Sequence, residues 1–182
     1  LCMGQTPAPT TIDDIDQDPP TLVKPLYDAI RNHDDEDLRH LLSQAHSAQG
    51  LSHFVMNVIA PLNTMVGDGW MRGELQVFEE HLYSETVQTL LRQAINQLPQ
   101  PSVRNRPRVL LTTFPQEQHG LGLLMVEALL SLYGCTCVSL GVQTPIRDIV
   151  MAAQAHQAQV IALSFSLAFN PSATILASGA SD

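Results

Sequence analysis

The sequence has few cysteines and no long apolar run, and each shortage excludes a class of protein. Its three cysteines, Cys2, Cys135 and Cys137, are odd in number and lack CxxC or zinc-ligand spacing, which argues against a disulfide framework or a structural zinc. No apolar run reaches the roughly 18 residues of a membrane-spanning helix, and the N-terminus shows no secretory signal pattern. We therefore expect a cytoplasmic protein with no membrane partner.

The sequence is also poor in positive charge. It has 9 Lys and Arg against 18 Asp and Glu, a formal net charge of −9, whereas nucleic-acid binding requires clustered Lys and Arg that displace counterions from phosphates. It contains no Gly-x-Ser-x-Gly elbow, no Walker loop and no Gly-x-Gly-x-x-Gly after a strand. This part of the protein is therefore not expected to bind DNA itself.

The composition is that of a globular protein, with 45% apolar and 15% charged residues in a chain of 182. Residues 1–20 are rich in Pro, Thr, Asp and Gln and lack an apolar period, which is typical of a linker or tail. We expect two domains after it, over 21–98 and 107–182. Because the chain starts at Leu1 instead of Met and stops just after a strand-like run, we expect it to be part of a longer protein.

Residues 21–98 predict four helices with short turns, the pattern of a four-helix bundle. Two short amphipathic helices come first, and Asp34 or Asp35 is expected to cap the second. A third is expected from about Ser52, kinked by Pro61. Its end is expected to be loosened by three glycines, and a fourth helix to run from about Glu74 to Leu98 before two prolines. The glycines are Gly67, Gly69 and Gly73.

After residue 107 the period changes to alternating strands and helices. Strands are predicted over 109–114, 135–140 and 160–164, with helices over 121–133 and from Thr144-Pro145 onward. This alternation predicts an α/β fold with a doubly wound parallel sheet, Rossmann-like or flavodoxin-like. Such sheets bind ligands outside the carboxyl ends of their strands. The loops after Phe114, Leu140 and Ser164 are therefore expected to form the site.

The loop after the first strand carries the residues with the clearest chemistry. Glu117 and His119 are followed by Gly120 and Gly122. An imidazole nitrogen can ligate a transition metal, and a carboxylate bonded to the other nitrogen fixes the tautomer and raises the basicity. Glycines allow the backbone to approach a large ligand. The alternative is structural: His119 only begins a helix, and Gly122 only packs that helix against the sheet.

The spacing Glu117-x-His119-x-x-Gly122 resembles the Asp/Glu-x-His-x-x-Gly signature of cobalamin-binding domains. The resemblance implies that His119 coordinates cobalt from the lower face of a corrin. A second family marker, Ser-x-Leu after the third strand, corresponds to Ser164-Phe165-Ser166, which keeps the first Ser and lacks the Leu. Ser164 and Ser166 are therefore expected to contact the cofactor. The third marker, a Gly-Gly pair after a later strand, has no counterpart in this sequence.

In the helical part, Trp70 is followed after nine residues by Glu80-His81. This spacing resembles the cap signature of the CarH/LitR group of light-sensing MerR-type transcription regulators. The resemblance implies adenosylcobalamin as cofactor, with Trp70 shielding its adenosyl group and Glu80 and His81 hydrogen-bonding nearby. The alternative is that Trp70 is a core anchor and Glu80-His81 a solvated helix face.

One departure concerns the residue after the tryptophan. Some light-responsive relatives have a second His there, whereas this chain has Met71. In an illuminated state, either another residue such as His81 ligates cobalt, or water does, or the protein is not a photoreceptor.

The resemblance implies a regulatory sensor and not an enzyme. It implies a homo-oligomer, a dimer or tetramer, that reaches DNA only through a domain absent from this chain. Two alternatives stay open: a corrinoid carrier protein of a methyltransferase system, and an interaction domain with a degenerate pocket.

Overall fold

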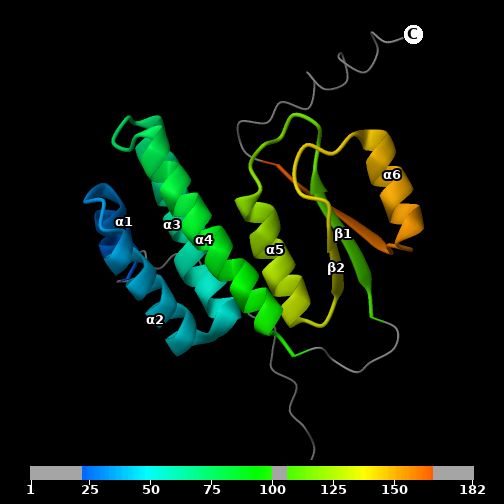
Figure 1. Ribbon diagram of the computed structural model, residues 1–182, viewed down its shortest axis with the longest axis horizontal. Helices are drawn as coiled ribbons and strands as arrows, with labels where there is room; N and C mark the ends of the chain where they lie inside the picture. Colours follow the sequence, from blue (N-terminus) through cyan, green and yellow to red (C-terminus); the bar gives the residue numbers. More distant parts are fainter. Residues whose placement is uncertain (1–21, 100–105, 166–182) are drawn as a thin grey trace, which may run out of the picture.

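The computed structural model describes residues 22–99 and 106–165, and its helical half comes first (Figure 1). The helical elements in chain order are α1 (Val23–Arg31), α2 (Asp35–His53), a π-helical segment (Phe54–Ile59), α3 (Ala60–Met71) and α4 (Val77–Gln97). Residues 1–20, predicted to be a linker, lie outside the described residues. The prediction of a helical bundle is confirmed.

Local chemistry explains where α2 begins and where the chain bends after it. The Asp34 carboxylate accepts a hydrogen bond from the Asp37 amide at 3.0 Å, as an N-cap should. At Gly50 the backbone leaves helical geometry, with φ 75° and ψ 164°. The π-helical segment follows and ends just before Pro61, which has no amide hydrogen to donate. The irregularity expected at Pro61 therefore lies in the turns that precede it.

The end of α3 corrects the sequence prediction for two glycines. α3 continues without interruption through Gly67 and Gly69 to Met71, so neither residue loosens it. Gly69 instead allows a close contact, because the hydroxyl of buried Tyr27 occupies the space that a Cβ at this position would need. Of the three glycines expected to loosen the end of this helix, only Gly73, with φ 72°, has a left-handed backbone.

The second half is a three-stranded parallel sheet, as predicted. β1 (Arg108–Thr113) lies between β2 (Thr136–Ser139) and β3 (Val160–Ser164). Figure 1 shows α5 (Leu121–Leu132) and α6 (Ile146–Ala155) on opposite sides of this sheet, which is the doubly wound arrangement. All three strands therefore end at the same edge.

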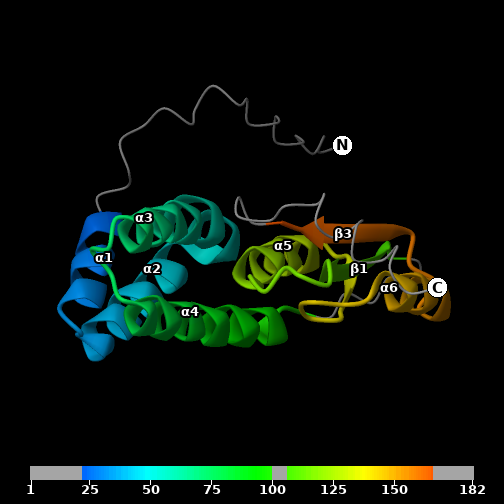
Figure 2. The ribbon, with the colours of Figure 1, turned by 90° about the horizontal axis from the view of Figure 1, so that it is seen from above.

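Helix α5 is the element that joins the two halves. Leu121, Leu124 and Ala128 are buried in the same apolar cluster as the core of the helical half, whereas Leu123 is buried against the sheet with Leu111. Figure 2 shows α5 between α4 and the strands. The helical half is thereby held beside the α5 face of the sheet. In the described segments, no helix is both long and apolar enough to cross a membrane.

We expect Gly69→Ala to lower the free energy of unfolding by about 1–3 kcal/mol, because the new methyl group would force Tyr27 out of its packed position. Gly67→Ala, in the same helix, is the matched control, because a Cβ there has no neighbour within 4 Å. The control should leave stability unchanged or raise it by up to about 1 kcal/mol through helix propensity. Urea unfolding measures both, and adding Tyr27→Phe should recover much of the loss. Equal stability of the two alanine variants would contradict the packing argument.

Candidate functional site

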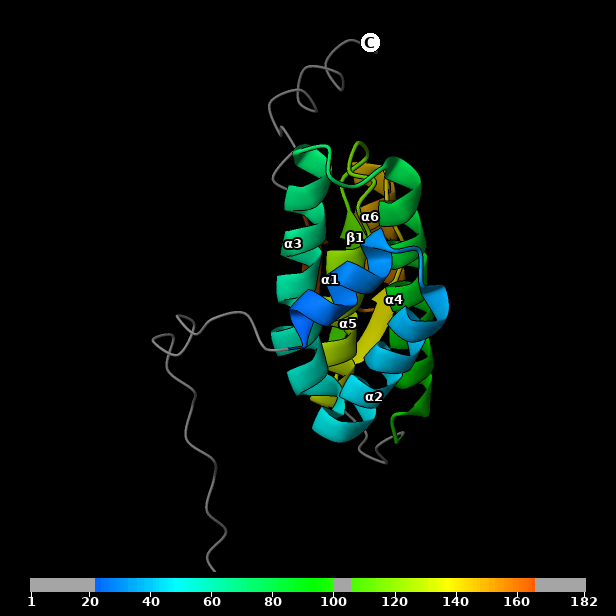
Figure 3. The same ribbon diagram turned by 90° about the vertical axis from the view of Figure 1, so that its left-hand side faces the viewer.

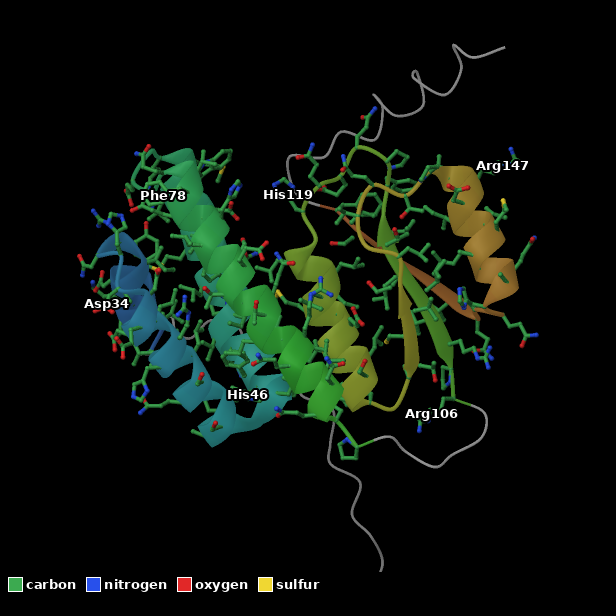
Figure 4. All side chains as sticks on the ribbon, in the orientation of Figure 1. Asp34, His46, Phe78, Arg106, His119 and Arg147 are labelled. Carbon is green, nitrogen blue, oxygen red and sulfur yellow. The ribbon has the colours of Figure 1, made fainter. Side chains whose placement is uncertain are left out.

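The loop between β1 and α5 places a buried carboxylate under an exposed imidazole. The Glu117 side chain is 2% exposed, and its Oε1 accepts hydrogen bonds from the His119 amide at 2.9 Å and from His119 Nδ1 at 2.7 Å. The His119 side chain is 68% exposed. In Figure 4, His119 lies at the edge of the sheet half that faces the helical half. The two residues that the sequence singled out are therefore in direct contact.

This contact determines what the imidazole can do. A buried carboxylate needs hydrogen-bond donors, and here the amide and ring nitrogens of one residue supply two. With the proton on Nδ1, donated to Glu117, the other ring nitrogen of His119 presents its lone pair outward. Carboxylate–imidazole pairs of this kind orient metal-binding histidines. The arrangement is chemically suited to one metal–nitrogen bond.

Threonines that the sequence analysis missed fix the loops around this pair. Thr113 Oγ1 donates to the Glu117 carbonyl at 2.8 Å and accepts from the Gln143 amide at 2.8 Å. Thr112 Oγ1 bonds Thr144 Oγ1 at 2.7 Å. The loops after β1 and β2 are thus held together at the end of the sheet. Consecutive threonines at the end of a buried strand were the available signal.

Gly120 in this loop and Gly122 in the first turn of α5 allow close packing. A Cβ at Gly120 would lie 3.0 Å from Val142 Cγ1, and one at Gly122 would lie 3.3 Å from Ser164 Oγ. Gly122 therefore brings α5 close to the end of β3, which agrees with its proposed packing role. Ser164, from the second family marker, lies beside the first turn of α5. Ser166 lies outside the described residues.

In the helical half, the predicted cap residues lie on both sides of the turn between α3 and α4. Trp70 is 50% exposed, so the hypothesis that it is a core anchor is wrong. Glu80 accepts a hydrogen bond from Ser84 Oγ at 2.6 Å and lies 3.6 Å from His81 Nε2. The His81 side chain is 70% exposed. All three side chains are therefore accessible to a ligand.

Figures 1 and 3 place the turn between α3 and α4 and the loop before α5 at the same end of the molecule. The cap residues Trp70, Glu80 and His81 belong to the helical half, and the Glu117–His119 pair belongs to the sheet half. Both sets therefore lie at the same end of the molecule. No group of three or more His, Cys, Asp or Glu suited to holding a metal ion occurs within residues 22–99 and 106–165.

Comparison with known protein families identifies the class. Two family models, each described as a B12 binding domain, match residues 22–95 and 107–176. The first match includes α1 to α3 and most of α4, and the second includes the sheet and the His119 loop. The chain therefore belongs to the cobalamin-binding domains, with a helical part followed by a Rossmann-like sheet.

Within this class the chain is CarH-like. It is 36% identical over 107 residues to the HTH-type transcriptional repressor CarH of Myxococcus xanthus, which corresponds to 59% of this chain and 35% of the repressor. The chain thus spans about a third of the length of the curated relative it matches. A solved cobalamin-binding protein from Desulfitobacterium hafniense DCB-2 matches over 80% of this chain and 69% of its own, with 17% identity and a TM-score of 0.41.

We expect Thr113→Val to lower the free energy of unfolding by about 1–3 kcal/mol, because it removes one buried and one partly buried hydrogen bond while keeping the side chain's shape. Thr136→Val is the control, because Thr136 is exposed on the neighbouring strand. Urea midpoints at an unchanged slope measure the difference. If both valine variants unfold at the wild-type midpoint, Thr113 does not hold the loops.

Proposed function

We propose that this chain is the adenosylcobalamin-binding sensory part of a light-responsive MerR-type transcription regulator. In this proposal His119 ligates cobalt from the lower face, and Glu117 orients its ring. Trp70, Glu80 and His81 cover the upper, adenosyl face. The likeness to a CarH repressor supports the regulatory role, and the B12 binding domain matches support the cofactor.

The observation that carries the proposal is the hydrogen bond between buried Glu117 and exposed His119 at the carboxyl end of β1. If cobalamin is bound here, His119 would supply one imidazole nitrogen to its cobalt, and a cluster of three or more protein ligands would not be needed. Gly122, which lets α5 approach β3, and Ser164 beside it belong to the same surface. Ser166 is proposed to contact the cofactor.

The upper face is assigned to the helical half for a physical reason. Trp70 is the only tryptophan of the chain and offers a broad, half-exposed apolar ring at the end shared with His119. Glu80, oriented by Ser84, and His81 provide polar groups on the next helix. Bound adenosylcobalamin would supply a light-sensitive cobalt–carbon bond.

The regulatory logic follows from differential binding. Contacts between the cap side chains and the adenosyl group stabilise one conformation, and loss of that group removes them. We propose that this change alters a homo-oligomer, a dimer or tetramer, and that DNA is bound through a domain outside this chain. The domain boundaries at 98 and 107 stay predictions.

We expect His119→Ala to weaken cobalamin binding by about 10–100-fold or more, in line with the effect of losing metal-site contacts, and to shift the visible spectrum of the bound cofactor. His40→Ala, an exposed histidine on α2, is the matched control and should leave both unchanged. Titration in darkness, followed by visible absorbance, measures binding and spectrum together. An unchanged spectrum in His119→Ala would exclude His119 as the ligand.

We expect the wild-type protein to bind adenosylcobalamin more tightly than methylcobalamin in darkness, and green light to change its colour and elution volume. Trp70→Ala should still bind corrin but lose the preference for the adenosyl form, because the shielding ring is gone. Tyr133→Ala, an exposed aromatic after α5, is the control. Tighter binding of methylcobalamin by the wild-type protein would favour the corrinoid carrier instead.

A further inference from the structure

The segment between α3 and α4, residues 72–76, joins the two parts of the cap, and we call it the connector. It begins two positions after Trp70 and ends four positions before Glu80. Helix ends carry unpaired backbone groups and fray unless other groups hold them. Because Trp70 and His81 are half or more exposed, their positions depend on how the backbone beside them is held.

One contact from α1 holds the first end of the connector. Tyr27 is buried, and its hydroxyl donates to Glu74 Oε2 at 3.3 Å. Arg72 binds the same carboxylate through Nε at 2.8 Å. The Tyr27 hydroxyl reaches this position only because Gly69 has no side chain. Gly69, the residue before Trp70, is thus in close contact with the Tyr27 side chain of α1.

A second contact, from the turn after α1, holds the other end. His33 Nε2 lies 2.7 Å from Oε1 of buried Glu79, and its ring packs against Phe78 with the ring centroids 5.5 Å apart. Glu79 also accepts a hydrogen bond from the Gln76 amide, which completes a capping box at the start of α4. This bond, with the His33 contact, holds the pKa of Glu79 below its usual value, although burial raises it.

The backbone at His33 is in the left-handed region. His33 has φ 57°, a left-handed conformation that a side chain with a Cβ adopts at a cost. Glycine would fit this position more easily. The Tyr27 hydroxyl of α1 and the His33 imidazole of the turn after α1 thus contact both ends of the connector, and neither element carries a cap residue.

We propose that Tyr27 and His33 are positioning residues for the cap, which set Trp70 and the Glu80-His81 pair in the geometry that selects the adenosyl group. This role rests on the proposed function. Neither residue touches the cofactor in this proposal. Tyr27 acts through Gly69 and Glu74, and His33 acts through Glu79.

The variants separate this role from general stability. His33→Gly removes the imidazole while relieving the left-handed backbone, and His33→Gln restores a donor at a similar reach. Gln157→Gly is the matched control, because Gln157 also has a positive φ, of 53°, but follows α6. Tyr27→Phe removes only the hydroxyl, and Lys24→Ala, an exposed residue of α1, is its control.

The first measurement uses the cofactor-free protein. Because Trp70 is the only tryptophan, acrylamide quenching of its fluorescence reports on the cap alone. Since half of the ring is already exposed, we expect His33→Gly and Tyr27→Phe to raise the quenching constant by at most about twofold, as in a locally loosened segment. His33→Gln and both controls should match the wild-type protein.

The second measurement is the ratio of the dissociation constants for methyl- and adenosylcobalamin in darkness. We expect it to fall by about 5–10-fold in His33→Gly and Tyr27→Phe, the lower range of coupling between linked sites, and to recover in His33→Gln. His119→Ala should weaken both forms and keep the ratio. Variants with the wild-type ratio would overturn the positioning role, whether or not quenching changes, and leave the proposed function standing. A wild-type protein without adenosyl preference would overturn both.

Discussion

The burial of two opposite faces of α5 is the constraint on which the rest of the structure depends. One face completes the core of the helical half, and the other packs on the sheet. Burying apolar surface stabilises a fold by roughly 25 cal/mol per Å², so separating the halves would expose both the helical core and this helix. Because the His119 loop leads directly into α5, the same packing fixes that loop beside the helical half.

A second constraint acts inside the loop. A carboxylate that is almost fully buried must be hydrogen-bonded, and Glu117 receives two donors from His119 alone. Glu117 therefore fixes the orientation of the His119 imidazole through Nδ1, while most of the ring stays exposed. Thr113 links this loop to the loop after β2, because its hydroxyl bonds both the Glu117 carbonyl and the Gln143 amide. The chemistry of the loop is local, but its rigidity comes from the neighbouring strands.

Sequence patterns predicted the order and type of the elements well, because helical and strand periods follow from which face is buried. They were wrong about Gly67 and Gly69, which were expected to loosen α3. A glycine in a sequence is consistent either with an unusual backbone conformation or with a close neighbour that leaves no room for a Cβ. Only the position of Tyr27 shows that Gly69 is a glycine with a close neighbour. Likewise, a lone tryptophan is as consistent with a core anchor as with a surface, and Trp70 proved half-exposed.

The sequence by itself determined the fold class, the parallel sheet, an N-cap at Asp34 or Asp35 and the pairing of Glu117 with His119, because these depend on periods and on contacts between near neighbours in the chain. Only the tertiary structure decided that Tyr27 of α1 and His33 of the turn after it hold the connector, and that the cap residues and the His119 loop share one end. Those contacts join residues some 46 or 47 positions apart, and no local period encodes which distant side chains meet.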